Sequence, residues 1–351
     1  MTVLLAGQPV RRVLIRSLNW IGDAVMSTPA IGIIREHFPQ AEIVLLANPV
    51  VAPLFQSHEW VDRVIIFDQK GTHRGLSGRL RLAAELRKQQ FDAAIIFPNS
   101  FNAALVPWLA RIPIRLGKVS DGRKLLLTGR YRPAHIRHEV EYYVDLLEHF
   151  GITGSRHPLT LQVTGEEERA ADLLLASHGV DRDICVLGIN PGATYGAAKR
   201  WYPERFAEAA SRLAEQWSAR PVIFGSQAEK PLADEIERLL NGKAINLAGT
   251  TTVRQLMALI RRCDFFITND SGPMHIAAAF GVPQVAVFGS TDHATTSPWS
   301  PVAAVVRKET DCAPCKLREC PTDHRCMTSV NAEDVITAAL KLRQVCPPRS
   351  V

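Results

Sequence analysis

The stretch FFITNDSGPMHIAAAFGVPQVAVFG, residues 265–289, carries the pattern that decides the fold. Two apolar, β-branched runs flank an alanine-rich segment, which predicts a parallel unit of strand, helix and strand. Between the first run and the helix lie Asn269, Asp270, Ser271, Gly272 and Pro273. Open α/β sheets bind their ligands at the carboxyl ends of strands. The stretch therefore predicts a parallel sheet and a ligand site at its edge.

The same alternation continues along most of the chain. Strand-like runs occupy 11–18, 41–48, 61–68, 92–99, 184–192, 221–226, 244–249, 264–270 and 283–289. Helical patterns occupy 24–38, 80–90, 138–152, 203–217, 229–240 and 252–263. A chain of 351 residues exceeds what one hydrophobic core usually organises. We predict an α/β protein with two doubly wound domains, 1–165 and 166–351, facing across a cleft, whose last helix can pack back on the first domain.

Composition restricts the class of protein. Hydrophobic residues make up 46% and charged residues 22%, which excludes a largely disordered or fibrous chain. The first residues lack the pattern of a signal peptide, and no apolar run approaches the roughly 20 residues that span a bilayer. We therefore expect a cytoplasmic protein. The net charge of +6 permits an anionic partner without choosing among nucleic acid, phospholipid and phosphorylated sugar.

One segment concentrates positive charge. This segment, residues 115–132, contains one acidic residue, Asp121. Its basic residues are Arg115, Lys118, Arg123, Lys124, Arg130 and Arg132. A solvated surface loop and an anion-binding surface both fit this pattern.

Three strand ends in the second half suit a nucleotide. At the first, Asp270 or Ser271 can cap a helix whose amino end attracts phosphate, with His275 one turn further; a simple cap with a buried histidine is the alternative. At the second, Lys199 and Arg200 follow Gly192, although the spacing of a P-loop is absent. At the third, Glu229 can accept hydrogen bonds from ribose or serve as an ordinary first-turn acid.

Two strand ends in the first half suit a hydroxylated acceptor. Asn19 and Trp20 follow the first strand, and Asp23 stands at the start of the next helix, where it can act as a general base or as an N-cap. A second strand end offers acceptor contacts from Asn99, Ser100 and Asn102.

Five stretches resemble the bacterial heptosyltransferases of glycosyltransferase family nine, in the family's order. They are NWIGDAVMSTPA (19–30), PNSFNAALVPWLARIPIRLG (98–117), NPGATYGAAKRWYPERF (190–206), NLAGTTTVRQLMALI (246–260) and TNDSGPMHIAAAFGVP (268–283). The resemblance implies a GT-B fold and inverting transfer of heptose from ADP-heptose onto the lipopolysaccharide inner core, without a catalytic metal.

The resemblance also implies roles for individual residues. Asp23 matches the family's proposed general base, and Lys199 matches its donor-phosphate lysine. Thr194 lies in the donor loop, Asp270, Ser271, Gly272 and His275 match the diphosphate and sugar motif, and Glu229 matches the ribose-binding acid more loosely. The basic stretch, with Arg123 and Lys124, suits a phosphorylated acceptor at the inner face of the inner membrane, which the protein contacts peripherally; no nucleic acid is expected. The alternatives are a family member with another acceptor and a non-catalytic nucleotide-sugar-binding protein.

A cysteine cluster follows the last of these stretches. Cys312, Cys315, Cys320 and Cys326 begin with a C-x-x-C pair, which suits a structural zinc ion in a cytoplasmic protein. The later spacings differ from the common paired site, so reduced thiols remain the alternative.

Overall fold

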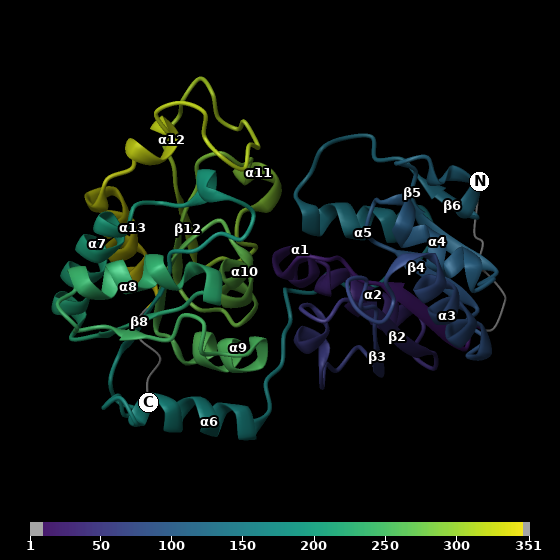
Figure 1. Ribbon diagram of the computed structural model, residues 1–351, viewed down its shortest axis with the longest axis horizontal. Helices are drawn as coiled ribbons and strands as arrows, with labels where there is room; N and C mark the ends of the chain where they lie inside the picture. The colour runs from purple at the N-terminus through teal and green to yellow at the C-terminus, as the bar shows by residue number, and fades with distance from the viewer. Residues whose placement is uncertain (1–9, 347–351) are drawn as a thin grey trace. The chain divides into compact units, whose positions relative to one another are not determined.

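The computed structural model describes residues 10–346. The chain divides into two compact units, Met1–Gln162 and Val163–Val351, which we call unit 1 and unit 2 (Figure 1). This division lies within a few residues of the boundary expected from the sequence.

Unit 1 is a parallel six-stranded sheet with strand order β3-β2-β1-β4-β5-β6. Its strands are β1 Arg12–Arg16, β2 Glu42–Ala47, β3 Arg63–Ile66, β4 Ala93–Ile96, β5 Ile114–Lys118 and β6 Gly129–Tyr131. Its helices are α1 Ile21–Met26, α2 Thr28–His37, α3 Gly75–Lys88, α4 Phe101–Leu109 and α5 Glu139–His149, with short 3₁₀ turns η1 Ala52–Phe55 and η2 Arg123–Leu126. The chain adds β2 and β3 on one side of β1 and then returns to add β4, β5 and β6 on the other side, so the order of strand addition reverses between β1 and β4. These two strands are parallel neighbours, and their residues Arg16 and Ile96 are paired.

Unit 2 repeats this topology, with strand order β12-β11-β10-β7-β8-β9. Its strands are β7 Val186–Asn190, β8 Arg220–Ile223, β9 Ile245–Asn246, β10 Phe265–Asn269, β11 Gln284–Val287 and β12 Ala303–Val306. Its helices are α6 Gly165–Ala176, α7 Pro203–Trp217, α8 Lys230–Leu239, α9 Val253–Arg262, α10 Gly272–Ala279, α11 His293–Thr296, α12 Arg325–Thr328 and α13 Ala332–Val345, with turns η3 Ala197–Lys199 and η4 Gln227–Glu229. Here the order of strand addition reverses between the parallel neighbours β7 and β10, where Asn190 and Thr268 are paired. The predicted α/β class with two doubly wound sheets is confirmed.

The helix predicted over 24–38 is interrupted in the structure. Pro29 lacks an amide hydrogen, so the carbonyl of Val25 has no helical donor. Thr28 Oγ1 donates to that carbonyl at 2.8 Å, and Ser27 Oγ donates to the carbonyl of Ala24 at 2.7 Å. These bonds end α1 and start α2, and they leave α1 as a short helix directly after β1.

Helix α6, Gly165–Ala176, is not among the helical patterns that the sequence predicts. It begins with a capping box in which Thr164 and Glu167 exchange hydrogen bonds. Glu167 also pairs with Arg254 of α9, the helix against which α6 packs. The last helix, α13, packs against α7, β11 and β12 of its own unit.

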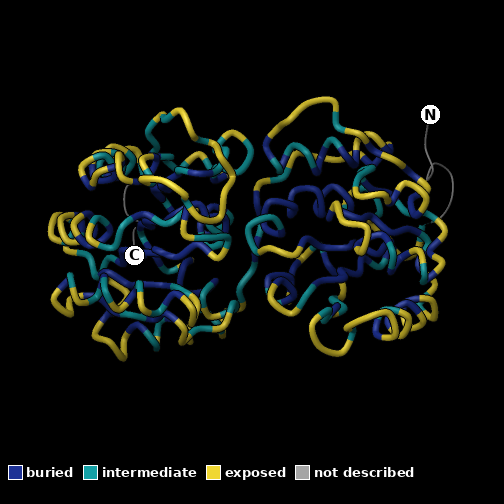
Figure 2. The backbone as a smooth tube through the Cα atoms, turned by 45° about the horizontal axis from the view of Figure 1, so that its top comes forward, coloured by how far each residue is buried: buried dark blue, intermediate teal, exposed yellow. Residues whose placement is uncertain are grey.

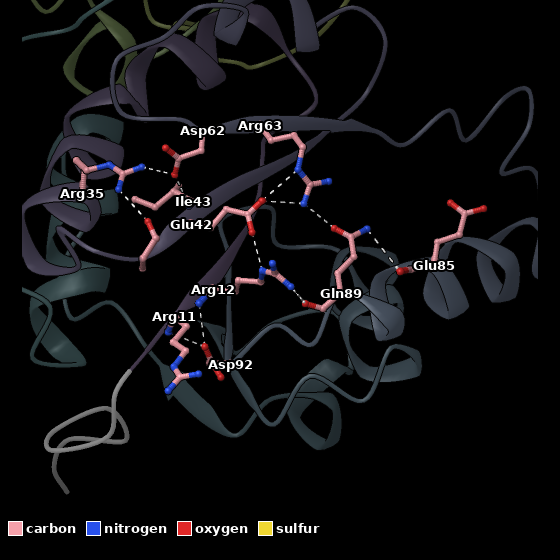
Figure 3. Close-up of polar contacts among 11 residues, drawn as sticks. Arg11, Arg12, Arg35, Glu42, Ile43, Asp62, Arg63, Glu85, Gln89 and Asp92 are labelled. Atoms are coloured by element: carbon pink, nitrogen blue, oxygen red, sulfur yellow. Dashed lines mark hydrogen bonds and ion pairs between the residues drawn. The ribbon is translucent and has the colours of Figure 1, made fainter.

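Charged side chains join the strand starts of unit 1 (Figure 3). Glu42 accepts from Arg12 at 2.6 Å and from Arg63 at 3.0 Å, which ties the first residues of β1, β2 and β3 together. Asp92, just before β4, accepts from the backbone amides of Arg11 and Arg12. These charges fasten the amino edge of the sheet and leave the carboxyl edge for other functions.

The inner strands of each sheet lie in the interior of its unit, whereas the connecting loops lie largely at the surface (Figure 2). Within residues 10–346, no helix has the length and apolar character needed to cross a membrane.

Candidate functional site

In unit 2, amide and hydroxyl side chains join the loops that leave β7 and β10. Asn269 Oδ1 accepts from the amide of Trp201 at 3.0 Å, and its Nδ2 donates to the carbonyl of Pro191 at 2.6 Å. Asn190 Nδ2 donates to Ser271 Oγ at 3.1 Å. These bonds hold the two loops side by side at the carboxyl ends of β7 and β10, where the strand order reverses. Doubly wound sheets bind ligands at this position.

Lys199 and Asp270 meet directly at this point. Lys199 Nζ lies 2.6 Å from Asp270 Oδ2, and their side chains are 14% and 5% exposed. Thr291 Oγ1 donates to the same carboxylate oxygen at 2.5 Å. Because the pair is nearly desolvated, it holds the lysine in a defined place rather than as a mobile surface charge. Thr291, which follows β11, is a site residue that the sequence motifs did not indicate.

The amino end of α10 has no side-chain cap. Ser271 is its N-cap residue by backbone geometry, but no side-chain cap bond forms among the described residues. Ser271 Oγ instead contacts Asn190 and Thr268. The alternative of a simple capped helix is therefore not what the structure has. The first amides of α10, with Gly272 at the start and His275 buried one turn later, are arranged as in an anion site.

Glu229 lies against the loop that follows β7. Its Oε2 accepts from the amide and from the hydroxyl of Ser226, both at 2.8 Å, so it closes the turn after β8. A Cβ added to Gly192 would come within 2.2–2.6 Å of the Glu229 carboxylate, so only glycine permits this approach. Glu229 thus combines the first-turn role with a position beside β7, and its contact with ribose stays a prediction.

The remaining donor candidates line the loop 193–200. Thr194 is exposed, and Arg200 Nη2 lies 3.4 Å from the carbonyl of Ala193. Tyr195, which sequence reasoning did not select, has Lys199 Nζ 5.0 Å from its ring centroid. The structure brings all the donor candidates to the strand ends of one sheet.

In unit 1, a buried arginine supports the loop after β1. Arg16 is 1% exposed, donates to Asn19 Oδ1 at 2.9 Å and to the carbonyl of Leu46 at 3.1 Å, and burial lowers its pKa to about 10. Trp20, the N-cap residue of α1, is 47% exposed. Asp23 lies in the first turn of α1 and is not the N-cap, so the capping alternative does not apply to it.

The loop after β4 carries the other acceptor candidates. Asn99, Ser100 and Asn102 are exposed, with Ser100 at the N-cap position of α4. Asn99 Oδ1 accepts from Tyr142 Oη at 3.3 Å, and its carbonyl accepts from Ser120 Oγ at 2.7 Å. Since β1 and β4 are neighbours in a parallel sheet, the loops after them share one edge.

The expectation that Arg123 contacts the acceptor is wrong. Its side chain is fully buried, and its guanidinium donates to the carbonyls of Lys118 (2.8 Å), Pro98 and Ser100 (3.3 Å). Burial lowers its pKa. A guanidinium has five donors in a fixed plane, which suits it to gather several carbonyls. Arg123 thus positions the loop that carries Ser100, whereas Lys124 is exposed and able to meet a ligand.

Helix α5 adds a second carboxyl group near Asp23. Burial raises the pKa of Glu139, which also accepts a hydrogen bond from Tyr143 one turn further. Burial is also the main cause that raises the pKa of Tyr143, and the negative charges of Glu139 and Asp23 raise it further. Neither Glu139 nor Tyr143 stood out in the sequence, because both belong to an ordinary amphipathic helix pattern.

A hollow of about 480 Å³ on unit 1 is lined by Arg87, Trp108, Leu109, Arg111 and Arg115. These residues lie at the end of α3, at the end of α4 and at the start of β5, that is, at the amino edge of the sheet. The hollow is therefore not part of the candidate site.

The four cysteines lie in and after the loop between β12 and α12. Cys312 and Cys315 are exposed and Cys326 is buried. Burial raises the pKa of Cys326 to about 11, and the neighbouring charges of Cys312, Cys315 and Cys320 contribute. In residues 10–346, no group of three or more histidine, cysteine or acidic side chains is gathered to hold a metal ion. These side chains do not form a metal site as they are placed, and structural zinc stays a prediction that metal analysis of the purified protein tests.

Comparison with known proteins identifies the family. The profile of glycosyltransferase family 9 (heptosyltransferase) matches residues 79–325. Lipooligosaccharide heptosyltransferase 2 of Campylobacter jejuni is 32% identical over 94% of this chain and 99% of its own length. Lipopolysaccharide heptosyltransferase 2 of Escherichia coli is 32% identical over 84% of this chain and 88% of its own.

The fold is also similar to that of a heptosyltransferase whose structure has been solved. The E. coli ADP-heptose LPS heptosyltransferase II has a TM-score of 0.80 at 29% identity, covering 95% of this chain and 99% of that one. The chain belongs to glycosyltransferase family 9, the heptosyltransferases. It is a glycosyltransferase, and the predicted GT-B class is confirmed.

Proposed function

We propose that this protein transfers L-glycero-D-manno-heptose from ADP-heptose onto a heptose of the lipopolysaccharide inner core, with inversion at the anomeric carbon. The similarity to relatives named heptosyltransferase 2 supports the choice of acceptor over those of other family members. The observation that carries the proposal is the pair of strand-end sites, one with buried Lys199 and Asp270 and one with Asp23.

Unit 2 binds the donor in this proposal. As the bond between heptose and ADP breaks, negative charge grows on the departing diphosphate. The amides at the start of α10, Lys199 and His275 stabilise that charge from fixed positions, which is how preorganised donors lower a barrier. Ser271 and Gly272 admit the phosphates, Asp270 orients Lys199 and contacts the sugar, and Glu229 binds the ribose. Thr194 and Arg200 contact the donor from the loop that covers it.

Unit 1 binds and activates the acceptor. Asp23 removes the proton from the acceptor hydroxyl as its oxygen attacks the anomeric carbon from the face opposite to ADP. One displacement of this kind inverts the configuration without a covalent intermediate. Trp20 stacks on a sugar face, and Asn19, Asn99, Ser100 and Asn102 bind hydroxyl groups. Lys124 faces the phosphates of the inner core.

Catalysis in this proposal needs no bound metal. The cationic and amide groups of unit 2 supply the positive potential that a divalent ion supplies in other transferases. Transfer is therefore expected to continue at an unchanged rate in excess EDTA. A rate that falls on chelation and returns with one particular divalent ion contradicts this part of the proposal.

The proposal places the protein peripherally at the cytoplasmic face of the inner membrane, with no nucleic-acid partner. Leu125 and Ile136 are 83% and 85% exposed, and the exposed cations Lys124 and Arg132 stand close to them in the sequence. Exposed apolar side chains beside cations suit an anionic lipid surface. The variant Leu125→Ser with Ile136→Ser is expected to bind anionic vesicles less than the wild type while its transfer to a detergent-free, truncated acceptor is unchanged. Equal vesicle binding contradicts the assignment.

A mass-spectrometric transfer assay tests the function. Purified protein and ADP-heptose are incubated with inner-core acceptors that carry no heptose or one heptose. The expected result is addition of one heptose to the mono-heptosylated acceptor only. Addition to the acceptor without heptose indicates another member of the family, and binding of ADP-heptose with no transfer indicates a non-catalytic binding protein.

A further inference from the structure

The loop between β12 and α12, residues 307–324, is attached to the donor loop 193–200. The amide of Ala198 donates to the carbonyl of Arg318 at 2.9 Å, and Tyr195 Oη donates to the carbonyl of Lys316 at 2.8 Å. His324 Nε2 lies 3.0 Å from the carbonyl of Ala198. The two loops are therefore joined at three places by hydrogen bonds.

Two further features fix Arg318 in this arrangement. A Cβ added to Gly196 would lie 2.2 Å from the carbonyl oxygen of Arg318, so glycine is required for the close approach of the two backbones. The amide of Lys316 donates to the carbonyl of Ser290, just after β11, at 2.7 Å. The segment 316–318 is thus held between the donor loop and the loop that follows β11, which fixes the backbone from which the Arg318 side chain extends.

The Arg318 side chain lies over the same ring as Lys199. Its Cζ is 5.2 Å from the centroid of Tyr195, and Lys199 Nζ is 5.0 Å from that centroid. The two positive charges are therefore no further apart than about twice these distances. An aromatic ring attracts each cation and offsets part of their mutual repulsion.

The charges around Lys199 leave room for a second cation. Lys199 is paired with Asp270, so this pair together carries no net charge toward a ligand. A sugar diphosphate carries two negative charges. Among residues 10–346, Arg318 has no acidic side chain as partner, and it is exposed to solvent. Its guanidinium is thus a positive charge beside the donor loop that forms no ion pair within residues 10–346.

We propose that Arg318 is a donor-binding residue that contacts the diphosphate of the nucleotide sugar together with Lys199. The loop 307–324 is then a wall of the donor site, and the cysteine-bearing segment contributes to the site through its backbone contacts with 195–198. This inference rests on the proposed function, because it takes the diphosphate to lie beside Lys199. It adds a residue outside the motifs that the sequence indicated.

Nucleotide binding by purified variants tests the proposal, with ADP, AMP and adenosine as probes at low and high salt. Arg318→Gln is expected to weaken ADP binding about five- to tenfold, because an exposed guanidinium contact with phosphate is worth less than a buried one. The salt dependence of ADP binding is expected to become shallower, and adenosine binding is expected to stay unchanged. Arg318→Lys is expected to regain part of the ADP affinity.

Arg325→Gln is the matched control. It removes the same charge seven residues along the chain, where the side chain is exposed and paired with Asp323 at 3.1 Å. Its ADP affinity is expected to equal that of the wild type. Unchanged ADP binding in Arg318→Gln overturns the proposal. Equal weakening of ADP and adenosine also overturns it, since that result assigns Arg318 a purely structural role.

The two proposals fail in different ways. If the proposed function is wrong, the wild type binds ADP but transfers no heptose, and the effect of Arg318→Gln on ADP persists. If the Arg318 proposal is wrong, the enzyme transfers heptose and Arg318→Gln binds ADP as the wild type does.

Discussion

Unit 1 and unit 2 contain sheets with the same strand order, and each places its candidate site where the sheet reverses, between β1 and β4 or between β7 and β10. The strand ends are held in different ways. In unit 1 the buried guanidinium groups of Arg16 and Arg123 donate to carbonyls at the ends of strands and in the loop after β4. In unit 2 the amide groups of Asn190 and Asn269 join the loops.

The two units therefore differ in where their positively charged side chains lie. Unit 1 keeps two of its cations inside and presents Trp20 and Phe101, 47% and 41% exposed, with the amides of Asn19 and Asn99 nearby. Aromatic faces and amides suit the rings and hydroxyls of a sugar. Unit 2 brings Lys199 and Arg318 to the ring of Tyr195, which suits a diphosphate. One topology thus supports two kinds of site through the residues that follow its strands.

The largest effect is expected in unit 2. Lys199→Gln removes the cation from a buried pair, so kcat/KM is expected to fall about 10²- to 10³-fold. Thermal stability is also expected to fall, because Asp270 is left as an uncompensated buried charge. The control is Lys199→Gln combined with Asp270→Asn, which should regain stability without regaining transfer. Recovery of transfer in the double variant contradicts the phosphate role of Lys199.

Arg123 tests how unit 1 is held together. Arg123→Met removes the guanidinium that donates to three backbone carbonyls and is expected to cost about 2 kcal/mol or more of the free energy of unfolding. Lys124→Met, at the exposed neighbouring position, is expected to change stability by no more than about 0.5 kcal/mol. Chemical denaturation of both variants checks this. A raised acceptor KM with unchanged stability in Arg123→Met contradicts the buried role.

Trp20 tests the proposed sugar-binding surface of unit 1. Trp20→Ala is expected to raise the KM for the acceptor about tenfold, because a large stacking surface is lost, and to leave the KM for ADP-heptose unchanged. Trp108→Ala is the matched control. Trp108 is 45% exposed, but it lies at the carboxyl end of α4, which is at the amino edge of the sheet and away from the candidate acceptor residues. Steady-state kinetics with each substrate varied in turn separates the two. Equal effects of the two substitutions on the acceptor KM contradict the assignment.

The smallest effect is expected at the amino edge of unit 1. Burial raises the pKa of Glu42, but hydrogen bonds from Arg63 and Arg12 outweigh burial and hold it below its usual value. A carboxyl group with a lowered folded pKa stabilises the protein above its unfolded pKa of about 4.3, and this contribution is lost as the pH falls through the folded value. Both arginines are more than 40% exposed, so Glu42→Gln is expected to cost less than about 1 kcal/mol at pH 7.

Denaturation at several pH values checks this expectation. The difference between Glu42→Gln and the wild type should shrink below pH 4, and transfer should be unaffected. If the stability difference between the wild type and Glu42→Gln grows as the pH falls, the pKa of Glu42 is not lowered in the folded protein.

The strand ends were predictable because they combine two signals, an apolar run and a following glycine, proline or asparagine. This is why Lys199, Asp270 and Asp23 were found at the right edges of their sheets. For Arg123 the sequence predicts the wrong location, because a charged residue in a basic stretch is expected at the surface and only tertiary contacts with carbonyls of distant segments place it inside. Arg318 lies far along the chain from the motifs, so no local pattern associates it with the donor loop. Thr291 follows the strand-like run 283–289 closely, but only the folded chain brings its hydroxyl to Asp270.

The most direct test of the account is to measure donor binding and transfer separately in Asp23→Asn. The substitution keeps the shape of the side chain and removes its basicity. Heptose transfer by this variant is expected to fall about 10²- to 10⁴-fold, because the proton acceptor is lost. The dissociation constant for ADP-heptose is expected to stay within about twofold of the wild-type value, since Asp23 belongs to unit 1. Transfer at the wild-type rate, or a loss of donor affinity that matches the loss of rate, contradicts the account.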